Sequence, residues 1–191
     1  MAGPTLIPFG AARPRIADDA FVAPGAVLIG DVEIGAEASI WYNCVLRGDV
    51  NRMRVGARTN IQDGSVLHVD SPHPGAAEGH PTLIGEEVLI GHLAMVHGCI
   101  LHDRAFVGLG AIVMDGCEIE SFGMLAAGAL LTPGKRIPAG QLWAGRPAKY
   151  VRDLSDAERE ANLAGVFHYV ELARAHRAAL AAASTSSPRS G

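Results

Sequence analysis

A large aliphatic residue, or once a tryptophan, returns at every sixth position along most of this 191-residue chain. A helix does not give this pattern, because its apolar stripe recurs at three and four positions, and a plain strand alternates at two. Period six instead predicts a short strand and a turn, repeated, with one large side chain pointing inward per unit. Three units closing into a triangular coil give about 18 residues per turn of a parallel β-helix. The repeated residues are Ile16, Val22, Leu28, Ile34, Ile40, Leu46, Val55, Ile61, Leu67, Ile84, Ile90, Val96, Leu101, Val107, Val113, Ile119, Leu125, Leu131, Ile137 and Trp143.

A different pattern follows the last coil. Ser155 and Glu158 form a capping box, and we expect it to open a helix that runs to about Ala183. The sequence therefore predicts three parts: a repeat domain over 1–150, a helix packing along it over 151–183, and a disordered tail over 184–191.

Composition and charge exclude several classes of protein. The net charge is −4 and there is no basic stripe, so nucleic acid is not an expected partner. No apolar run reaches the length of a membrane span, and the N-terminus lacks the apolar segment of a signal peptide. Three cysteines, an odd number, fit a reducing compartment. We expect a soluble, cytoplasmic protein.

The repeat is interrupted where polar residues gather. Leu67 and Val96 are equivalent inward positions that lie 29 residues apart, one coil of 18 plus 11 more. An extra loop therefore leaves the coil within 69–81, a segment called the outloop below. His68 and His97 each follow one of those inward residues, so they should stack on one outer face. A three-residue slip in the repeat places Arg47 in the same column, one coil below His68.

A third histidine belongs to another part of the coil. His92 should sit over Asp63, near a corner, by the same count. Two stacked imidazoles can share one metal, and three imidazoles with an open position make a catalytic zinc site. Because His92 should not reach the metal held by His68 and His97 of its own chain, a neighbouring subunit would supply it. The two outloop histidines, His73 and His80, are expected to be solvated.

Several short motifs carry a resemblance over roughly 16–180 to the gamma-class carbonic anhydrase family of hexapeptide proteins. The resemblance implies that the β-helix is left-handed, so that the fold is all-β, a left-handed parallel β-helix of hexapeptide repeats with a C-terminal α-helix. The motifs are Arg47-Gly48-Asp49, Asn60-Ile61-Gln62-Asp63, His68, Gly91-His92 and His97-Gly98-Cys99.

The resemblance also implies an assembly, a metal and site residues. The protein would be a homotrimer with zinc sites between subunits, where His68 and His97 come from one chain and His92 from its neighbour. Gln62 would hydrogen-bond the attacking hydroxide or the bicarbonate, with Asn60 supporting the site and Tyr169 facing it from the helix. The charged pairs that join subunits near the site would be formed by Arg47, Asp49 and Asp63.

The expected reaction is the zinc-dependent, reversible hydration of carbon dioxide to bicarbonate. Zinc held by three imidazoles lowers the pKa of its water to about 7, which makes hydroxide available at neutral pH. Iron and cobalt also accept imidazole ligands. Catalytically proficient family members carry a glutamate at the position of Val50, so we expect turnover here to be slow.

Two other functions are open from the sequence. The first is acyl transfer or thioester hydrolysis, because the hexapeptide fold hosts many acyltransferases and WAGRPAK, residues 143–149, resembles their coil-ending motif. Such transferases commonly use a histidine base without metal, so three ligand-like histidines count against it. The second is a metal-binding structural or assembly subunit with little catalysis.

Overall fold

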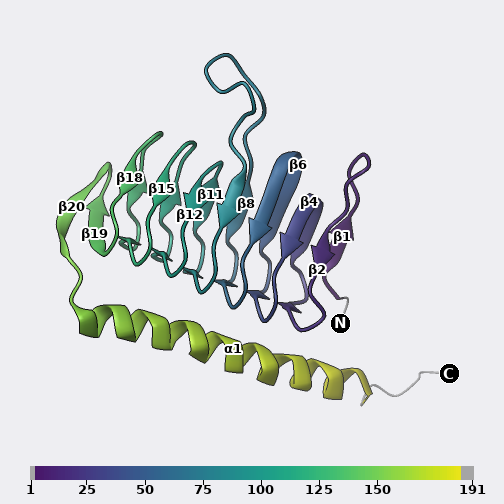
Figure 1. Cartoon of the computed structure of the whole chain (residues 1–191). Helices are drawn as coiled ribbons and strands as arrows, with labels where there is room; N and C mark the ends of the chain where they lie inside the picture. Colours follow the sequence, from purple (N-terminus) through teal and green to yellow (C-terminus); the bar gives the residue numbers. More distant parts are fainter. Residues whose placement is uncertain (1–2, 186–191) are drawn as a thin grey trace.

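The computed structural model describes residues 3–185. Within them the chain winds into a parallel β-solenoid, and one long helix runs beside the stack of coils (Figure 1). The fold is the predicted left-handed parallel β-helix of hexapeptide repeats with a C-terminal helix. The large residue of each unit points into the coil, because the three short strands of a turn must bury one side chain each.

Two of the three faces belong to one 12-stranded sheet, since the long strands β4 and β6 bend around the corner between them and pair on both sides. Its strands are β1 (Thr5–Ile7), β2 (Arg15–Ile16), β4 (Val27–Ile34), β6 (Val45–Val55), β8 (Val66–His68), β9 (Thr82–Ile84), β11 (Met95–His97), β12 (Ile100–Leu101), β14 (Ile112–Val113), β15 (Glu118–Ile119), β17 (Leu130–Leu131) and β18 (Arg136–Ile137).

The third face is a sheet of eight strands that ends in an antiparallel pair, β19 with β20. That pair closes the C-terminal end of the solenoid, so strand structure continues to Asp153 before the helix begins. The strands are β3 (Phe21–Val22), β5 (Ser39–Ile40), β7 (Asn60–Ile61), β10 (Leu89–Ile90), β13 (Phe106–Val107), β16 (Met124–Leu125), β19 (Gln141–Gly145) and β20 (Ala148–Asp153).

The repeated aliphatic residues form the core. From Leu101 to Ile137 every one of them is at most 1% exposed. Small residues fill the inner corners, and Cys44 and Cys117 are two of these. Burial raises the pKa of the Cys44 thiol to about 11, which leaves it a packing residue rather than a nucleophile.

Strand β1 was not predicted. It pairs with β4 so that Leu6 lies beside Leu28, 22 residues away. The turn at 8–12 adds four residues to the 18 of a standard coil. The residues before this turn therefore do not fit the period of six.

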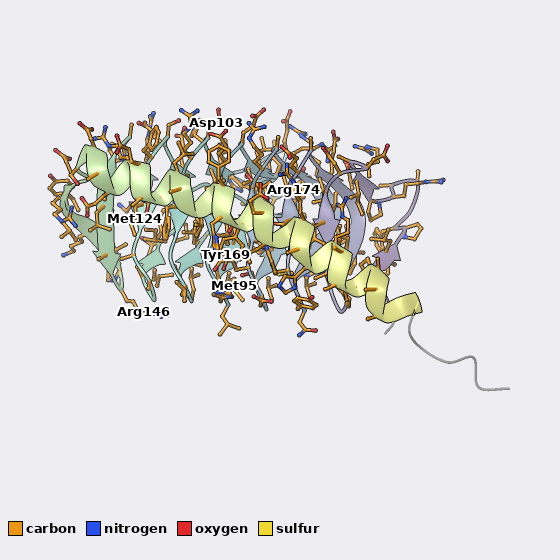
Figure 2. The ribbon with its side chains drawn as sticks, turned by 90° about the horizontal axis from the view of Figure 1, so that it is seen from below. Met95, Asp103, Met124, Arg146, Tyr169 and Arg174 are labelled. Atoms are coloured by element: carbon orange, nitrogen blue, oxygen red, sulfur yellow. The ribbon has the colours of Figure 1, made fainter. Side chains whose placement is uncertain are left out.

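The helix α1 spans Asp156–Thr185 and contacts the third face along β3, β5, β7 and β10. Figure 2 looks onto this helix-covered side. The capping box is present, because the Ser155 backbone N–H donates to Glu158 Oε2 at 2.9 Å. Val166, Val170 and Ala173 are buried against the coils. The helix continues to the end of the described residues, so residues 186–191 of the expected tail lie outside them. No helix within 3–185 is long and apolar enough to cross a membrane.

Two insertions interrupt the coils at neighbouring corners. In β6, Gly48 pairs with Gly30 but Met53 pairs with Val32, so three extra residues form a bulge at this point. The outloop leaves the solenoid between β8 and β9 and rises on the side away from the helix (Figure 1). The three-residue slip and the eleven-residue insertion of the sequence are therefore both real features of the backbone.

Candidate metal centre

His68 and His97 lie side by side on adjacent strands. β8 and β11 pair in register with His97 beside His68, and β6 pairs with β8 so that Arg47 is beside His68 on the other side. His68 Nδ1 lies 2.9 Å from His97 Nε2. The predicted column of Arg47, His68 and His97 is thus confirmed as an arrangement of residues.

Each of these two imidazoles has a carboxylate on its other nitrogen. His68 Nε2 donates to Asp49 Oδ1 at 2.9 Å, and His97 Nδ1 donates to Asp115 Oδ1 at 2.5 Å. A carboxylate only accepts, so both of these nitrogens carry the proton. In the neutral imidazoles the two remaining nitrogens carry lone pairs, and these face each other. A cation between them would resolve that contact, and a carboxylate behind each ring is the usual support of a metal-bound histidine.

Asp115 is a residue that the sequence reading missed. It follows His97 by 18 residues, one coil, so the same count that placed His68 and His97 could have found it. Asp115 lies in an uninterrupted part of the repeat, where no break in the period marks a site.

Asp49 comes from the bulge in β6. Arg47 Nη1 donates to Asp49 Oδ2 at 2.7 Å, within the same strand. Burial alone would raise the pKa of Asp49, but hydrogen bonds from Arg47 and His68 outweigh it and hold the pKa below its usual value. Asp49 is therefore ionised at neutral pH and positioned to hold the ring of His68.

His92 is on a different face, in the turn after β10. Leu93 N donates to Asp63 O, and His92 Nδ1 lies 2.9 Å from Asp63 Oδ2, which confirms that His92 sits over Asp63. His92 does not join His68 and His97 in a three-ligand group within residues 3–185. Its Nε2 lies 3.4 Å from the Tyr169 hydroxyl.

Three further predicted site residues lie on the third face or on the helix that covers it, as His92 lies in the turn after β10 of that face. Asn60 is on β7, which pairs with β10, and Gln62 directly follows that strand. Gln62 Nε2 donates to Asn60 Oδ1 at 3.1 Å. Asn60 is fully buried, and its Nδ2 has no hydrogen-bond partner. Tyr169 lies near the middle of the helix (Figure 2). Its pKa is raised, mainly by burial and also by the charge of Asp63.

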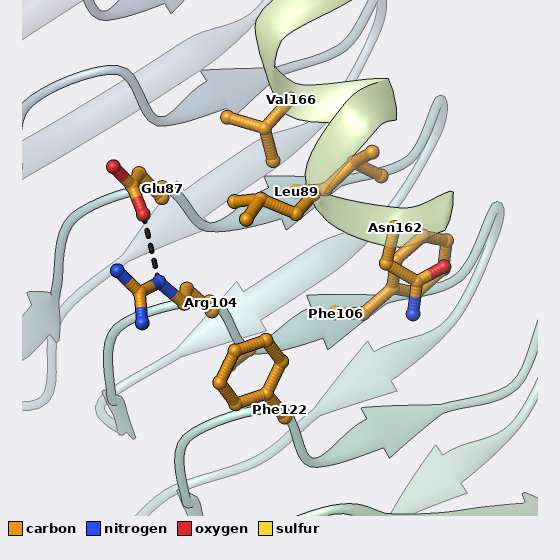
Figure 3. A pocket seen from close by; sticks show the side chains of 9 residues that line it. Glu87, Leu89, Arg104, Phe106, Phe122, Asn162 and Val166 are labelled. Atoms are coloured by element: carbon orange, nitrogen blue, oxygen red, sulfur yellow. Dashed lines mark hydrogen bonds and ion pairs between the residues drawn. The ribbon is translucent and has the colours of Figure 1, made fainter. Parts of the chain in front are cut away.

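Two hollows differ in what lines them. The first lies beside His97 and Asp115, and its remaining lining is Met95, Ile112, Val113 and Met114. The second lies between the helix and the third face, where Glu87 accepts a hydrogen bond from Arg104 at 2.8 Å (Figure 3). The residues lining the second hollow include no histidine. The apolar hollow beside His97 is thus the one next to the candidate ligands.

Comparison with known proteins places the chain among hexapeptide-repeat proteins. Residues 13–48 match the family described as bacterial transferase hexapeptide (six repeats). The chain is 49% identical over 165 residues to gamma carbonic anhydrase 1, mitochondrial, of Arabidopsis thaliana, covering 86% of this chain and 60% of that protein. It is 39% identical to a carbonic anhydrase of Geobacillus kaustophilus, covering 79% of each chain. A crystal structure of a hexapeptide transferase family protein from Anaplasma phagocytophilum superposes with a TM-score of 0.83 at 46% identity, covering 90% of this chain and 97% of that one.

The fold and the repeat define a hexapeptide-repeat protein of the β-helix class. Within that class the chain belongs to the gamma carbonic anhydrase-like family. It spans about six tenths of the length of the plant relative.

Proposed function

We propose that this protein hydrates carbon dioxide reversibly to bicarbonate, at a zinc site shared between subunits of a homotrimer. The observation that carries the proposal is the pair of lone-pair nitrogens on His68 and His97, each ring held by a carboxylate from behind. His92 has a similar arrangement on another face, with Asp63 on its Nδ1 and the Tyr169 hydroxyl 3.4 Å from its Nε2. A metal site between two subunits needs imidazole ligands on two different surfaces of each chain, and these three histidines are distributed in that way.

The backbone beside His92 supports a subunit contact there. Leu93 has φ of +59° and is 72% exposed. The corresponding corners of the coils on either side carry Gly64 and Gly110, both with positive φ. A left-handed backbone costs an ordinary residue roughly 1–2 kcal/mol. In a single chain the burial of the Leu93 side chain does little to offset this cost, because the side chain is largely exposed. Covered by a neighbouring subunit, it would bury apolar area that offsets the strain.

Other apolar side chains extend this surface. Met95 is 47% exposed beside the histidine column, and Leu109 is 51% exposed one coil beyond His92. A neighbouring subunit at these histidines would cover such exposed apolar side chains.

The residues of this chain have distinct parts in the proposed reaction. Zinc, when bound, would lower the pKa of a water toward 7 and so supply hydroxide at neutral pH. Asp49 and Asp115 hold the His68 and His97 rings in the tautomer that leaves the ligating nitrogen free. Asn60 accepts from the Gln62 amide and fixes its orientation, so that Gln62 can hydrogen-bond the attacking oxygen. Met95, Ile112 and Met114 give carbon dioxide an apolar wall beside His97.

Proton removal is the expected weak point. Val50 lies in the bulge next to Asp49 and is 46% exposed, so it faces solvent but has no proton to move. A nearby general acid or base normally relays the proton in this chemistry. We therefore propose that turnover is slow and depends on buffer.

Acyl transfer is the second candidate, since a structural neighbour is described as a hexapeptide transferase family protein. Transfer of an acyl group requires one histidine as a base, and it gives no reason for three imidazoles with carboxylates behind them. A metal-binding assembly subunit with little catalysis is the third, and turnover at full metal occupancy separates it from an anhydrase.

Metal analysis and a hydration assay test the proposal together. His68→Ala and His92→Ala should lower zinc binding at the shared site to the same extent, while His102→Ala, at a half-buried histidine paired with Glu118, should not. Raising imidazole at fixed pH and ionic strength should increase kcat, and Val50→Glu should increase it in weak buffer.

Refolded mixtures of His92→Ala and His97→Ala chains should regain part of the zinc. Unchanged zinc affinity in His92→Ala would overturn the shared site, and no turnover at full occupancy would overturn the reaction.

A further inference from the structure

The outloop carries a second group of ligand-type side chains. Asp70, His73 and His80 each offer one atom, and the three atoms lie within 4.8 Å of one another. His73 Nε2 is 3.0 Å and His80 Nδ1 is 2.9 Å from the same Asp70 oxygen, Oδ2. Both histidines were expected to be solvated; His73 is indeed exposed and His80 is partly exposed, and both also face the same carboxylate.

The outloop backbone is built to hold these three residues together. Asp70 N donates to His80 O at 2.9 Å, which clamps the base of the loop. His73 and Ala76 exchange two backbone hydrogen bonds of 3.0 Å at its tip. Asn51, from the β6 bulge, donates its side-chain amide to Asp70 O at 3.1 Å and to Glu78 O at 2.8 Å. Since these bonds do not involve the three ligand atoms, the cluster is positioned before any ligand arrives.

Two glycines of the coils make room for the His80 ring. A Cβ on Gly98 would lie 2.9 Å from the His80 Cβ, and one on Gly116 would lie 3.2 Å from His80 Nε2. His80 is therefore seated on the solenoid wall, with its Nδ1 turned outward to Asp70.

The tautomer of His73 is the decisive observation. His73 Nδ1 lies 3.1 Å from the carbonyl oxygen of Pro74, which only accepts, so Nδ1 carries the proton. In neutral His73 the lone pair on Nε2 then points at the Asp70 carboxylate, which is also an acceptor. Two acceptors 3.0 Å apart need a cation: either a second proton on the ring or a metal ion between them.

The geometry points to a divalent metal site formed by Asp70, His73 and His80, within one chain and separate from the shared site. Tetrahedral zinc with bonds of about 2.0–2.1 Å holds its ligand atoms roughly 3.3 Å apart, close to the 3.0 and 2.9 Å that separate His73 Nε2 and His80 Nδ1 from Asp70 Oδ2. Two imidazoles and one carboxylate are a ligand set that Zn²⁺ and Co²⁺ accept. Partial exposure of the side chains, 46% for His73 and 34% for His80, leaves space for water to complete the coordination.

The test separates this site from the shared one, because the two have no ligand in common. In a His68→Ala/His92→Ala protein, isothermal titration with Zn²⁺ and metal analysis after dialysis should still show one equivalent per chain. Loss of an outer-shell partner weakens metal binding roughly 10–100-fold. His73→Ala and Asp70→Asn each remove a proposed ligand and should weaken this binding by more than that. The matched control is His102→Ala, which removes a histidine–carboxylate pair with no third ligand.

A second readout does not depend on stoichiometry. Co²⁺ bound to the same protein should give a visible d–d absorption that His80→Ala removes, and Zn²⁺ should slow amide exchange in 69–81. Circular dichroism checks that the variants remain folded. If the His68→Ala/His92→Ala protein binds no zinc, the proposed site is wrong, and a protonated His73 ring facing Asp70 explains the cluster. Zinc binding that survives His73→Ala and His80→Ala would also overturn the site.

Discussion

The coils between residues 100 and 143 and the coils between 47 and 97 are made of the same repeat but differ in regularity. In the first region every unit has six residues, and the inward side chains from Leu101 to Ile137 are at most 1% exposed. The second region has the same buried ladder but contains the β6 bulge and the outloop. It carries all three histidines of the proposed shared site and every member of the outloop cluster.

This difference shows how a solenoid separates stability from chemistry. The inward side chain and the parallel ladder hold each coil, so extra residues at a corner leave the coils above and below in register. The β6 bulge supplies Asp49 to His68 and Asn51 to the outloop. Departures from the repeat are therefore where polar groups can be positioned without disturbing the core.

The largest expected effect tests the stabilising role of the regular coils. Leu125→Ala removes a fully buried inward side chain, and we expect it to lower the free energy of unfolding by about 2–5 kcal/mol. Zinc affinity of the folded variant should be unchanged. Denaturant unfolding and zinc titration measure the two quantities. Val151→Ala, at a side chain that is 52% exposed, is the control and should stay within about 0.5 kcal/mol.

Asp115 is the exception that sharpens the comparison, because it lies in the regular coils yet supports a proposed ligand. Asp115→Asn should weaken zinc binding at the shared site by about 10–100-fold, since the amide holds the His97 ring less strongly than the carboxylate. Competition with a chelator measures the affinity. Glu118→Gln, which removes the charge facing His102, should leave the affinity unchanged. Equal losses in both variants would mean that overall charge, rather than the His97 contact, sets the affinity.

The link between the bulge and the outloop can be broken separately. Asn51→Ala removes two hydrogen bonds to the outloop backbone, together worth about 1–3 kcal/mol. Local opening should become roughly tenfold more frequent or greater, seen as faster amide exchange at Ala76 and Gly79. Exchange in the regular coils should not change. Arg52→Ala, at the exposed neighbouring residue, is the control, and similar acceleration there would indicate a general loosening of β6.

The smallest effect concerns the helix cap, which lies outside both regions. Hydrogen bonds from Arg152 and then from Ser155 lower the pKa of Glu158 to about 2. A lowered carboxyl pKa stabilises the folded state above the ordinary value near 4.5, and this contribution is lost as the pH falls toward 2. Glu158→Gln should therefore flatten the fall in denaturant midpoint between pH 6 and pH 3. Glu160→Gln is the control, and an equal flattening there would contradict the cap as the cause.

Much of the fold followed from the sequence, because a period of six leaves few ways to bury one side chain per unit. The count of 18 also placed His68 beside His97 and His92 over Asp63. It did not find β1, where the turn at 8–12 breaks the period before it starts. On the helix, Phe167 is apolar but 46% exposed, since the contact with the coils follows Val166 and Val170 instead.

The outloop could not be predicted for a physical reason. Its conformation depends on hydrogen bonds from Asn51 and on space left by Gly98 and Gly116, and these residues come from three separate coils. No periodic signal in 69–81 specifies those contacts. The proton on His73 likewise depends on the position of the Pro74 carbonyl, which only a folded loop defines.

The outloop has a consequence for protein engineering. Its two ends are joined by the Asp70–His80 backbone hydrogen bond, and the strands that flank it, β8 and β9, each pair with β6 independently of what lies between them. Foreign segments of different length could replace 71–79 without changing the spacing of the coils. The scaffold would then display a variable peptide at a fixed position beside a metal-binding face, as antibody frameworks display their hypervariable loops.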